Sequence, residues 1–225
     1  MRLRPLTESC PKPLLEIGGR PIITYAMDHL LSIGIDRFII NTHHCPEMYA
    51  QKFADGKWRG RPIFFRHEPE LLDTAGGLKN IEDLLVEDKS ILCYNGDLLT
   101  DLPLQELLQT HEQHRPEATL ALRTTGPLLN VSINDRGGVC DLRGILQNPG
   151  IQSCLFTGIY ALETSLLQHI ESGKPETIIT TFIQRIAQKA GSVMGIIIDE
   201  GKWDDIGSRD VYERLKAEMA GMEDR

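Results

Sequence analysis

The chain has 225 residues, of which 41% are hydrophobic and 25% charged, a composition typical of a folded globular protein. Its 32 acidic and 24 basic residues give a formal net charge of −8, which argues against nucleic acid or an anionic membrane as a partner. Five scattered cysteines without a Cys-x-x-Cys pair favour a reduced, cytoplasmic protein over a disulfide framework. No apolar run reaches the roughly 18 residues of a membrane-spanning helix.

The first 125 residues alternate between predicted helices and strands. Helices are expected at 22–33, 47–53, 77–85 and 103–114, and strands at 37–41, 62–67, 90–95 and 118–125. His111 and His114 fall on the polar side of the fourth helix, where we expect them to be solvated. This alternation predicts an α/β sheet with helices on both faces.

After residue 125 the pattern changes. Strand-like segments at 129–134 and 139–142 flank Asp135-Arg136-Gly137-Gly138, which predicts a β-hairpin with a glycine-rich turn. Further strands are expected at 156–162 and 193–198, and helices at 164–171, 177–190 and 208–219. Because no repeat or low-complexity linker interrupts the chain, residues 1–225 are predicted to form a single domain.

The N-terminal segment combines basic side chains with prolines. Pro5, Pro11 and Pro13 exclude a regular helix, and Arg2 and Lys12 are placed on what should be an ordered loop. Two basic side chains in this arrangement suit the binding of two phosphates of one polyphosphate. A solvated basic loop that caps a sheet is the alternative from the spacing alone.

This segment resembles the opening motif of sugar nucleotidyltransferases, G-x-G-T-R-L-x-P-L-T followed by P-K-P-L-L. Five further segments are similar to motifs of that family in the same order: Gly19–Ile23, Asp73–Leu78, Asn95–Asp97, Phe156–Tyr160 and Trp203–Ser208. The compact length, without left-handed β-helix repeats, resembles the short bacterial type that includes N-acetylmuramate-, heptose- and mannose-1-phosphate nucleotidyltransferases.

The resemblance implies a Rossmann-like, mixed, mostly parallel sheet flanked by helices, the nucleotide-diphospho-sugar transferase fold. Residues 1–125 would form a nucleotide-binding half and residues 126–225 a sugar-binding half. Family members begin earlier, with an apolar strand and L-A-A-G-x-G. We therefore expect the first strand and most of the glycine-rich loop to be missing, with a gap in the sheet beside the strand that leads to Asp97. In this short form the chain is expected to be inactive.

The implied reaction transfers a nucleotidyl group from an NTP to a sugar 1-phosphate, giving NDP-sugar and pyrophosphate. Arg2 and Lys12 match the motif residues that contact phosphates, and Asp97 and Asp205 match the carboxylates that hold Mg²⁺. Because two polyanions must meet, metal and basic groups are the chemistry that this reaction requires. Each aspartate alone is also a common turn former, and Asp204 competes with Asp205 as the ligand.

Other positions follow from the resemblance alone. Gly76 and Gly77 match the loop whose backbone approaches the nucleobase, and Asp97 also belongs to the nucleotide site. Asn130 and Gly158 are the predicted sugar contacts, although the chain departs from the usual family residues around Asn130. The base, the sugar and the oligomeric state stay open.

Two other functions compete with the nucleotidyltransferase hypothesis. The first is a non-catalytic regulatory paralogue that binds a nucleotide sugar. Retention of four motif residues argues for the enzyme, and the missing glycine loop argues for the paralogue; the four are Arg2, Lys12, Asp97 and Asp205. The second is a glycosyltransferase of the related A type, but the segment from Asp97 to Asp101 lacks the D-x-D spacing of that class.

Overall fold

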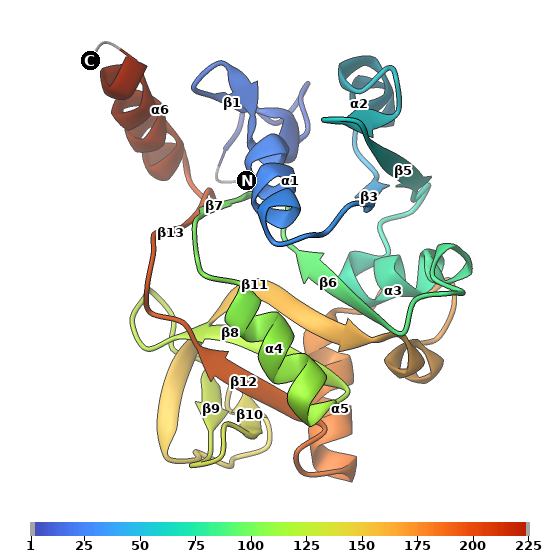
Figure 1. Ribbon diagram of the computed structural model, residues 1–225, viewed down its shortest axis with the longest axis vertical. Helices are drawn as coiled ribbons and strands as arrows, with labels where there is room; N and C mark the ends of the chain where they lie inside the picture. The colour runs from blue at the N-terminus through green and yellow to red at the C-terminus, as the bar shows by residue number, and fades with distance from the viewer. Residues whose placement is uncertain (1–2, 224–225) are drawn as a thin grey trace. The chain divides into compact units, whose positions relative to one another are not determined.

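The computed structural model describes residues 3–223, which form the expected mixture of helices and strands (Figure 1). The chain divides into two compact units whose segments interleave in the sequence. The first unit contains the described residues up to Pro69, the segment Asn95–Asp101 and the chain from Gly201 on. The second unit contains Glu70–Tyr94 and Leu102–Glu200.

The first unit combines a small sheet with three helices and several short strands. Strand β3 (Phe38–Thr42) pairs in parallel with β5 (Arg61–His67), and β4 (Lys57–Trp58) pairs antiparallel with β5. Its other elements are η1 (Lys12–Leu14), β1 (Glu16–Ile17), β2 (Arg20–Pro21), α1 (Ile22–Ser32), α2 (Pro46–Lys52), β7 (Leu98–Thr100), β13 (Trp203–Asp205) and α6 (Arg209–Glu223).

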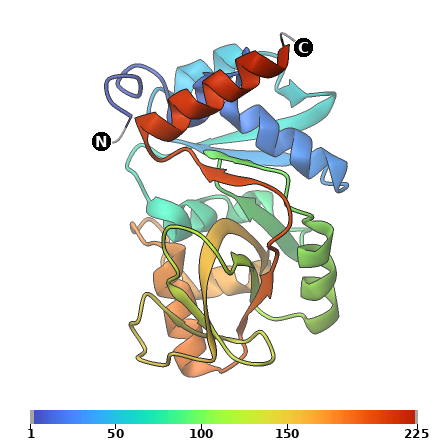
Figure 2. The same cartoon turned by 90° about the vertical axis from the view of Figure 1, so that its left-hand side faces the viewer.

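One hydrophobic cluster joins the N-terminal and C-terminal segments of the first unit. It contains the buried side chains Leu3, Leu15, Ile17, Ile22, Ile206, Tyr212 and Leu215. Tyr212 also donates a hydrogen bond from its hydroxyl to the backbone carbonyl of Glu16, at 2.9 Å. Helix α6 therefore packs beside the N-terminal segment (Figure 2).

The second unit is built on a six-stranded sheet centred on the long strand β11 (Gln152–Glu163). Antiparallel to β11 run β6 (Ser90–Tyr94), β8 (Ala118–Arg123) and β9 (Val131–Ile133), while β12 (Val193–Ile197) runs parallel to β8. The remaining elements are α3 (Asp73–Asn80), η2 (Glu82–Leu84), α4 (Gln105–His114), β10 (Val139–Leu142), η3 (Thr164–His169) and α5 (Ile178–Gln188). Strands β9 and β10 form the predicted hairpin.

Strands β3 and β6 each have a single pairing partner in the structure of residues 3–223. Among the described residues, β3 pairs only with β5, and β6 pairs only with β11. Strand β6 is the one that leads into Asn95 and Asp97.

The sequence predicted the longer elements and missed the shortest ones. Strands β1, β2 and β4 have two residues each, too few to show a period of two in the sequence. The helix expected at 77–85 begins at Asp73 and is followed by the 3₁₀ turn η2, and the helix expected at 164–171 is the 3₁₀ helix η3.

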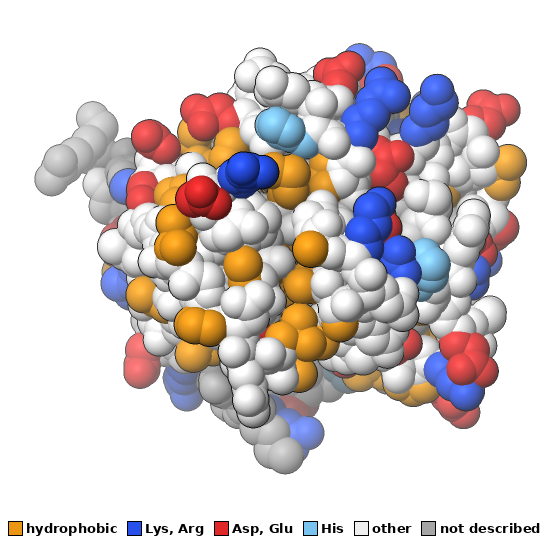
Figure 3. Space-filling view, turned by 90° about the horizontal axis from the view of Figure 1, so that it is seen from below, with side chains coloured by type: hydrophobic (Ala, Val, Ile, Leu, Met, Phe, Trp, Pro, Cys, Tyr) orange, Lys and Arg blue, Asp and Glu red, His pale blue; other side chains and the backbone are white. Residues whose placement is uncertain are grey.

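The surface carries mixed charge. On the face drawn in Figure 3, acidic and basic side chains lie interspersed with separate groups of hydrophobic atoms. Within the part of the chain that the structure describes, no helix is long and apolar enough to cross a membrane.

The expectation that His111 is solvated is wrong, because this side chain is buried between α4 and the sheet of the second unit. Its Nδ1 lies 2.8 Å from the Thr119 hydroxyl, and its Nε2 lies 3.2 Å from Oε1 of Glu163. Burial lowers the pKa of His111, and the nearby Glu163 carboxylate only partly offsets this effect. His114, on the same helix, is exposed as expected.

The lowered pKa of His111 predicts a pH-dependent stability. Since the unfolded chain binds this proton at a higher pH than the folded chain, the free energy of unfolding should fall as the pH falls below about 6.5. His111→Asn should reduce this dependence, whereas His114→Asn should retain it. Urea unfolding at several pH values between 5 and 8 measures the effect, and equal pH slopes in all three proteins would contradict it.

Candidate functional site

A cluster of one basic and two acidic side chains is assembled in the first unit from three distant parts of the chain. Lys12 begins the 3₁₀ helix η1, where the amide of Leu15 donates to the Lys12 carbonyl at 3.1 Å. The buried side chains of Leu14 and Leu15 anchor this turn in the unit. The turn thereby fixes the backbone from which the Lys12 side chain extends.

Asp97 reaches the cluster through the turn that precedes β7. The amide of Leu98 donates to the carbonyl of Asn95 at 3.3 Å, and Gly96 lies against the ring of Pro13. The close packing of Gly96 on Pro13 brings the turn next to the segment that carries Lys12.

Asp205 is placed by the pairing of β13 with β7. Asp205 is opposite Leu98 in the antiparallel register, and the amide of Ile206 donates to the carbonyl of Asp97 at 3.1 Å. The two aspartates therefore lie on adjacent strand ends, although they are far apart in the sequence.

The Lys12 ammonium lies within ion-pair distance of both carboxylates. Its Nζ is 2.5 Å from Oδ2 of Asp97 and 3.7 Å from Oδ1 of Asp205. The side chains of Lys12 and Asp97 are 25% and 29% exposed, and that of Asp205 is 52% exposed. The cluster is thus open to solvent and accessible to a charged ligand.

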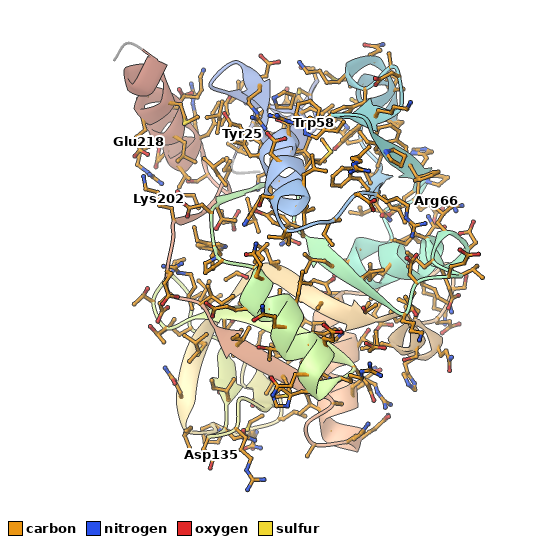
Figure 4. The ribbon with its side chains drawn as sticks, in the orientation of Figure 1. Tyr25, Trp58, Arg66, Asp135, Lys202 and Glu218 are labelled. Carbon is orange, nitrogen blue, oxygen red and sulfur yellow. The ribbon has the colours of Figure 1, made fainter. Side chains whose placement is uncertain are left out.

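The neighbouring Asp204 has a different environment. Successive side chains of a strand point to opposite faces, and Asp204 forms an ion pair with Arg214 of α6. Arg214 also pairs with Glu218 at 2.9 Å on the same helix (Figure 4). Of the two candidates from the sequence, it is Asp205 that lies beside Lys12.

Asp101 helps to hold the turn beside the paired strands β7 and β13 and is not part of the cluster. Its Oδ1 accepts a hydrogen bond from the Lys202 amide at 2.5 Å, and the Thr100 hydroxyl donates to the Lys202 carbonyl at 2.5 Å. Gly201 has a φ of +76°, and a Cβ there would lie 2.6 Å from the Asp101 carboxylate. Asp101 therefore shapes the turn that leads into β13.

The resemblance placed Gly76 and Gly77 in a loop, and the sequence pattern predicted a helix only from residue 77. Both glycines lie buried within helix α3 of the second unit, so the loop assignment is corrected. The amide of Gly76 donates to the backbone carbonyl of Glu176 at 3.2 Å, and a Cβ on Gly76 would lie 2.5 Å from the carbonyl oxygen of Lys174. The close packing of α3 on the segment before α5 explains the glycine at position 76.

The predicted sugar contacts also lie in the second unit. The carbonyl of Asn130, just before β9, accepts a hydrogen bond from the Arg143 amide at 2.7 Å. Gly158 is buried in β11 with a φ of +83°, where the register against β8 shifts between Phe156 and Tyr160. A glycine suits this irregularity because side-chain-bearing residues rarely adopt a positive φ. Arg2, the remaining predicted residue, lies outside the described residues.

Two polar arrangements in the first unit were not predicted from the sequence. The indole of Trp58 donates to Asp28 at 2.7 Å, and the guanidinium of Arg20 lies 4.1 Å from the ring centre of Tyr25 and 5.8 Å from that of Trp58 (Figure 4). This network anchors β4 on α1.

The second unpredicted arrangement surrounds Glu68. Glu68 follows β5, is buried, and accepts a hydrogen bond from the Asn41 amide group at 2.6 Å. In the sequence, the signal for this buried carboxylate is a charged residue directly after a predicted strand.

The donor set of the cluster fits a hard divalent cation. Among the described residues, no group of three or more His, Cys, Asp or Glu side chains gathers in a way that could hold a metal. Two carboxylates match Mg²⁺, which commonly takes one or two protein carboxylates and completes its shell with water and phosphate oxygens. A zinc site would require more nitrogen or sulfur ligands.

Comparison with known proteins places the chain in a family. The model of the nucleotidyl transferase family matches residues 1–221. The chain belongs to the nucleotidyl transferase family.

Relatives within this family share about a third or less of their residues with the chain. The mannose-1-phosphate guanylyltransferase of Mycobacterium tuberculosis is 27% identical over 221 residues, which are 97% of this chain and 61% of that protein. The mannose-1-phosphate guanyltransferase of Pichia angusta is 32% identical over 212 residues, 92% of this chain and 57% of that protein. The chain therefore spans about three fifths of the length of these relatives.

A solved structure confirms the fold. HddC from Yersinia pseudotuberculosis superposes with a TM-score of 0.78 over 97% of this chain and 94% of that chain, at 17% identity. The predicted nucleotidyltransferase fold, a mixed α/β architecture with flanking helices, is correct.

The packing at Gly76 predicts a selective loss of stability. Gly76→Ala introduces a methyl group against a backbone oxygen, so it should lower the free energy of unfolding by about 1–3 kcal/mol. Gly221→Ala is the matched control, since Gly221 lies in helix α6 and its Cβ would contact nothing within 4 Å. Thermal unfolding of both variants measures the difference, and an unchanged melting temperature for Gly76→Ala would contradict the prediction.

Proposed function

We propose that this protein transfers a nucleotidyl group from an NTP to a sugar 1-phosphate, giving NDP-sugar and pyrophosphate. The observation that carries the proposal is the position of the Lys12 ammonium at 2.5 Å from Asp97 and 3.7 Å from Asp205. The family match to residues 1–221 supports the same reaction class.

The reaction joins two anions, which determines what the protein must supply. A phosphate oxygen of the sugar 1-phosphate attacks the α-phosphorus of the NTP, and the bond from that phosphorus to the bridging oxygen of the pyrophosphate group breaks. Pyrophosphate leaves with the bonding electrons, so negative charge builds on the leaving oxygen. Positive charge at this point stabilises the transition state more than the ground state.

Each residue of the cluster has a proposed role in this chemistry. Asp97 and Asp205 hold Mg²⁺, which, when bound, neutralises phosphate charge. Lys12 donates hydrogen bonds to phosphate oxygens from an ammonium that the open side of the cluster leaves accessible. Arg2 is proposed to bind phosphate from the same N-terminal segment.

The remaining assignments follow from the resemblance and from the relatives. Gly76 and Gly77 are proposed to lie near the nucleobase, and Asn130 and Gly158 near the sugar. Because the relatives are named as mannose-1-phosphate guanylyltransferases, we propose GTP and mannose 1-phosphate as the first substrate pair to test. A reduced, cytoplasmic location is proposed from the cysteine pattern.

The proposed reaction is tested by pyrophosphate release from the full-length protein, with four NTPs and several sugar 1-phosphates. Asp97→Asn and Asp205→Asn keep the side-chain size but remove a charged ligand, and should lower turnover at least about a hundredfold. Asp204→Asn makes the same chemical change at the neighbouring residue that pairs with Arg214, and should retain most of the activity.

The activities of these variants distinguish Asp205 from Asp204 as the metal ligand, and the substrate screen distinguishes an enzyme from a regulatory protein. Near-normal turnover of Asp205→Asn together with loss in Asp204→Asn would transfer the metal role to Asp204. Nucleotide-sugar binding without pyrophosphate release for any substrate pair would favour a regulatory, non-catalytic protein.

Lys12 is predicted to act mainly in the transition state. Lys12→Ala should lower kcat strongly, by about a hundredfold, with a smaller change in KM, since charge on the leaving pyrophosphate develops only as the bond breaks. Steady-state kinetics with both substrates varied measure the two constants. A raised KM with an unchanged kcat would make Lys12 a binding residue only.

A further inference from the structure

The two carboxylates of the cluster already share a positively charged partner, the ammonium group of Lys12. The Lys12 ammonium lies 2.5 Å from Oδ2 of Asp97 and 3.7 Å from Oδ1 of Asp205. Lysine carries three donors on a compact charge, so one ammonium can serve two carboxylates at once.

A divalent cation held by Asp97 and Asp205 would need the same pair of anionic groups. Two cations at one carboxylate pair repel each other, because the repulsion rises with the product of the charges and falls with their distance and with the local dielectric constant. The partial burial of Lys12 and Asp97, at 25% and 29% exposure, limits the screening by water. The Lys12 ammonium must therefore move away before both carboxylates can bind a divalent cation.

The Lys12 side chain is able to move because only its backbone is fixed. The buried Leu14 and Leu15 hold the turn of η1, whereas the ammonium is at the end of a flexible four-carbon stem. A polyphosphate offers this ammonium a denser set of anionic oxygens than the two carboxylates do.

We propose that Lys12 is a built-in competitor of the divalent cation: its ammonium keeps the carboxylate pair of Asp97 and Asp205 occupied until a phosphate-bearing ligand draws it away. The identity of that ligand rests on the proposed function; the competition itself does not. By thermodynamic linkage, a ligand that withdraws the ammonium strengthens cation binding, and the cation strengthens binding of that ligand equally. Metal and nucleotide would thus enter the site together.

The competition is tested with Mn²⁺ alone, by following the free-ion signal in electron paramagnetic resonance during titration of the full-length protein. Lys12→Met removes the charge and should bind Mn²⁺ about tenfold more tightly than the wild type, as expected when a nearby unit charge is removed. Lys12→Arg keeps the charge and should bind as weakly as the wild type.

Two control variants test whether the change in Mn²⁺ affinity arises at the carboxylate pair. Lys52→Met makes the same change at a lysine that pairs with Glu16 at 2.8 Å, and should leave the Mn²⁺ affinity within about twofold of the wild type. Adding Asp97→Asn to Lys12→Met should abolish the gain, which assigns it to the carboxylate pair. Circular dichroism checks the fold of each variant, and Lys12→Gln replaces Lys12→Met if the latter does not fold.

An unchanged or weaker Mn²⁺ affinity in the charge-neutral Lys12 variants would overturn the proposal, as would equal tightening in Lys12→Arg. The titration contains neither nucleotide nor sugar. A protein that shows no nucleotidyl transfer at all, but binds Mn²⁺ more tightly after Lys12→Met, would fail the proposed function and still support the competition.

Discussion

The candidate site depends on holding one ammonium and two carboxylates together at the surface of the first unit. Exposed ion pairs stabilise a protein little, so the charges do not assemble the cluster by themselves. The assembly comes from the hydrophobic cluster that unites Leu15 near the N-terminus, Ile206 beside β13 and Tyr212 on α6. Apolar burial fixes the backbones, and the charged side chains then extend from fixed positions toward solvent.

Because the backbone is fixed by apolar packing, adjacent acidic residues on one strand can have different environments. Asp204 and Asp205 are equivalent in composition, but the strand geometry of β13 directs them to opposite faces. On one face Arg214 neutralises Asp204 and joins β13 to α6. On the other face Asp205 lies near Lys12. Two adjacent positions of one strand therefore differ in role: Asp204 pairs with Arg214, and Asp205 belongs to the candidate site.

The sequence predicted the elements that are long enough to show a period, and the resemblance predicted the members of the cluster. Spacing alone could not group Lys12 with Asp97, since 85 positions separate them and the contact depends on tertiary packing. His111 was misassigned because its helix is polar on average, whereas the side of the helix that carries Leu107 and His111 is buried. Gly76 was assigned to a loop because of the resemblance to the family's nucleobase-side loop, yet here it permits close packing of a helix.

The turn before β13 shows how a residue without a side chain determines where charge is placed. Gly201 adopts a positive φ, and its missing Cβ leaves room for the Asp101 carboxylate, which accepts the Lys202 amide. A Cβ at position 201 would lie 2.6 Å from that carboxylate and 3.0 Å from the Asp101 carbonyl oxygen, so the turn or the carboxylate would have to shift. Since Asp205 is positioned by the pairing of β13 with β7, its distance from Lys12 depends on a glycine that takes no part in the chemistry.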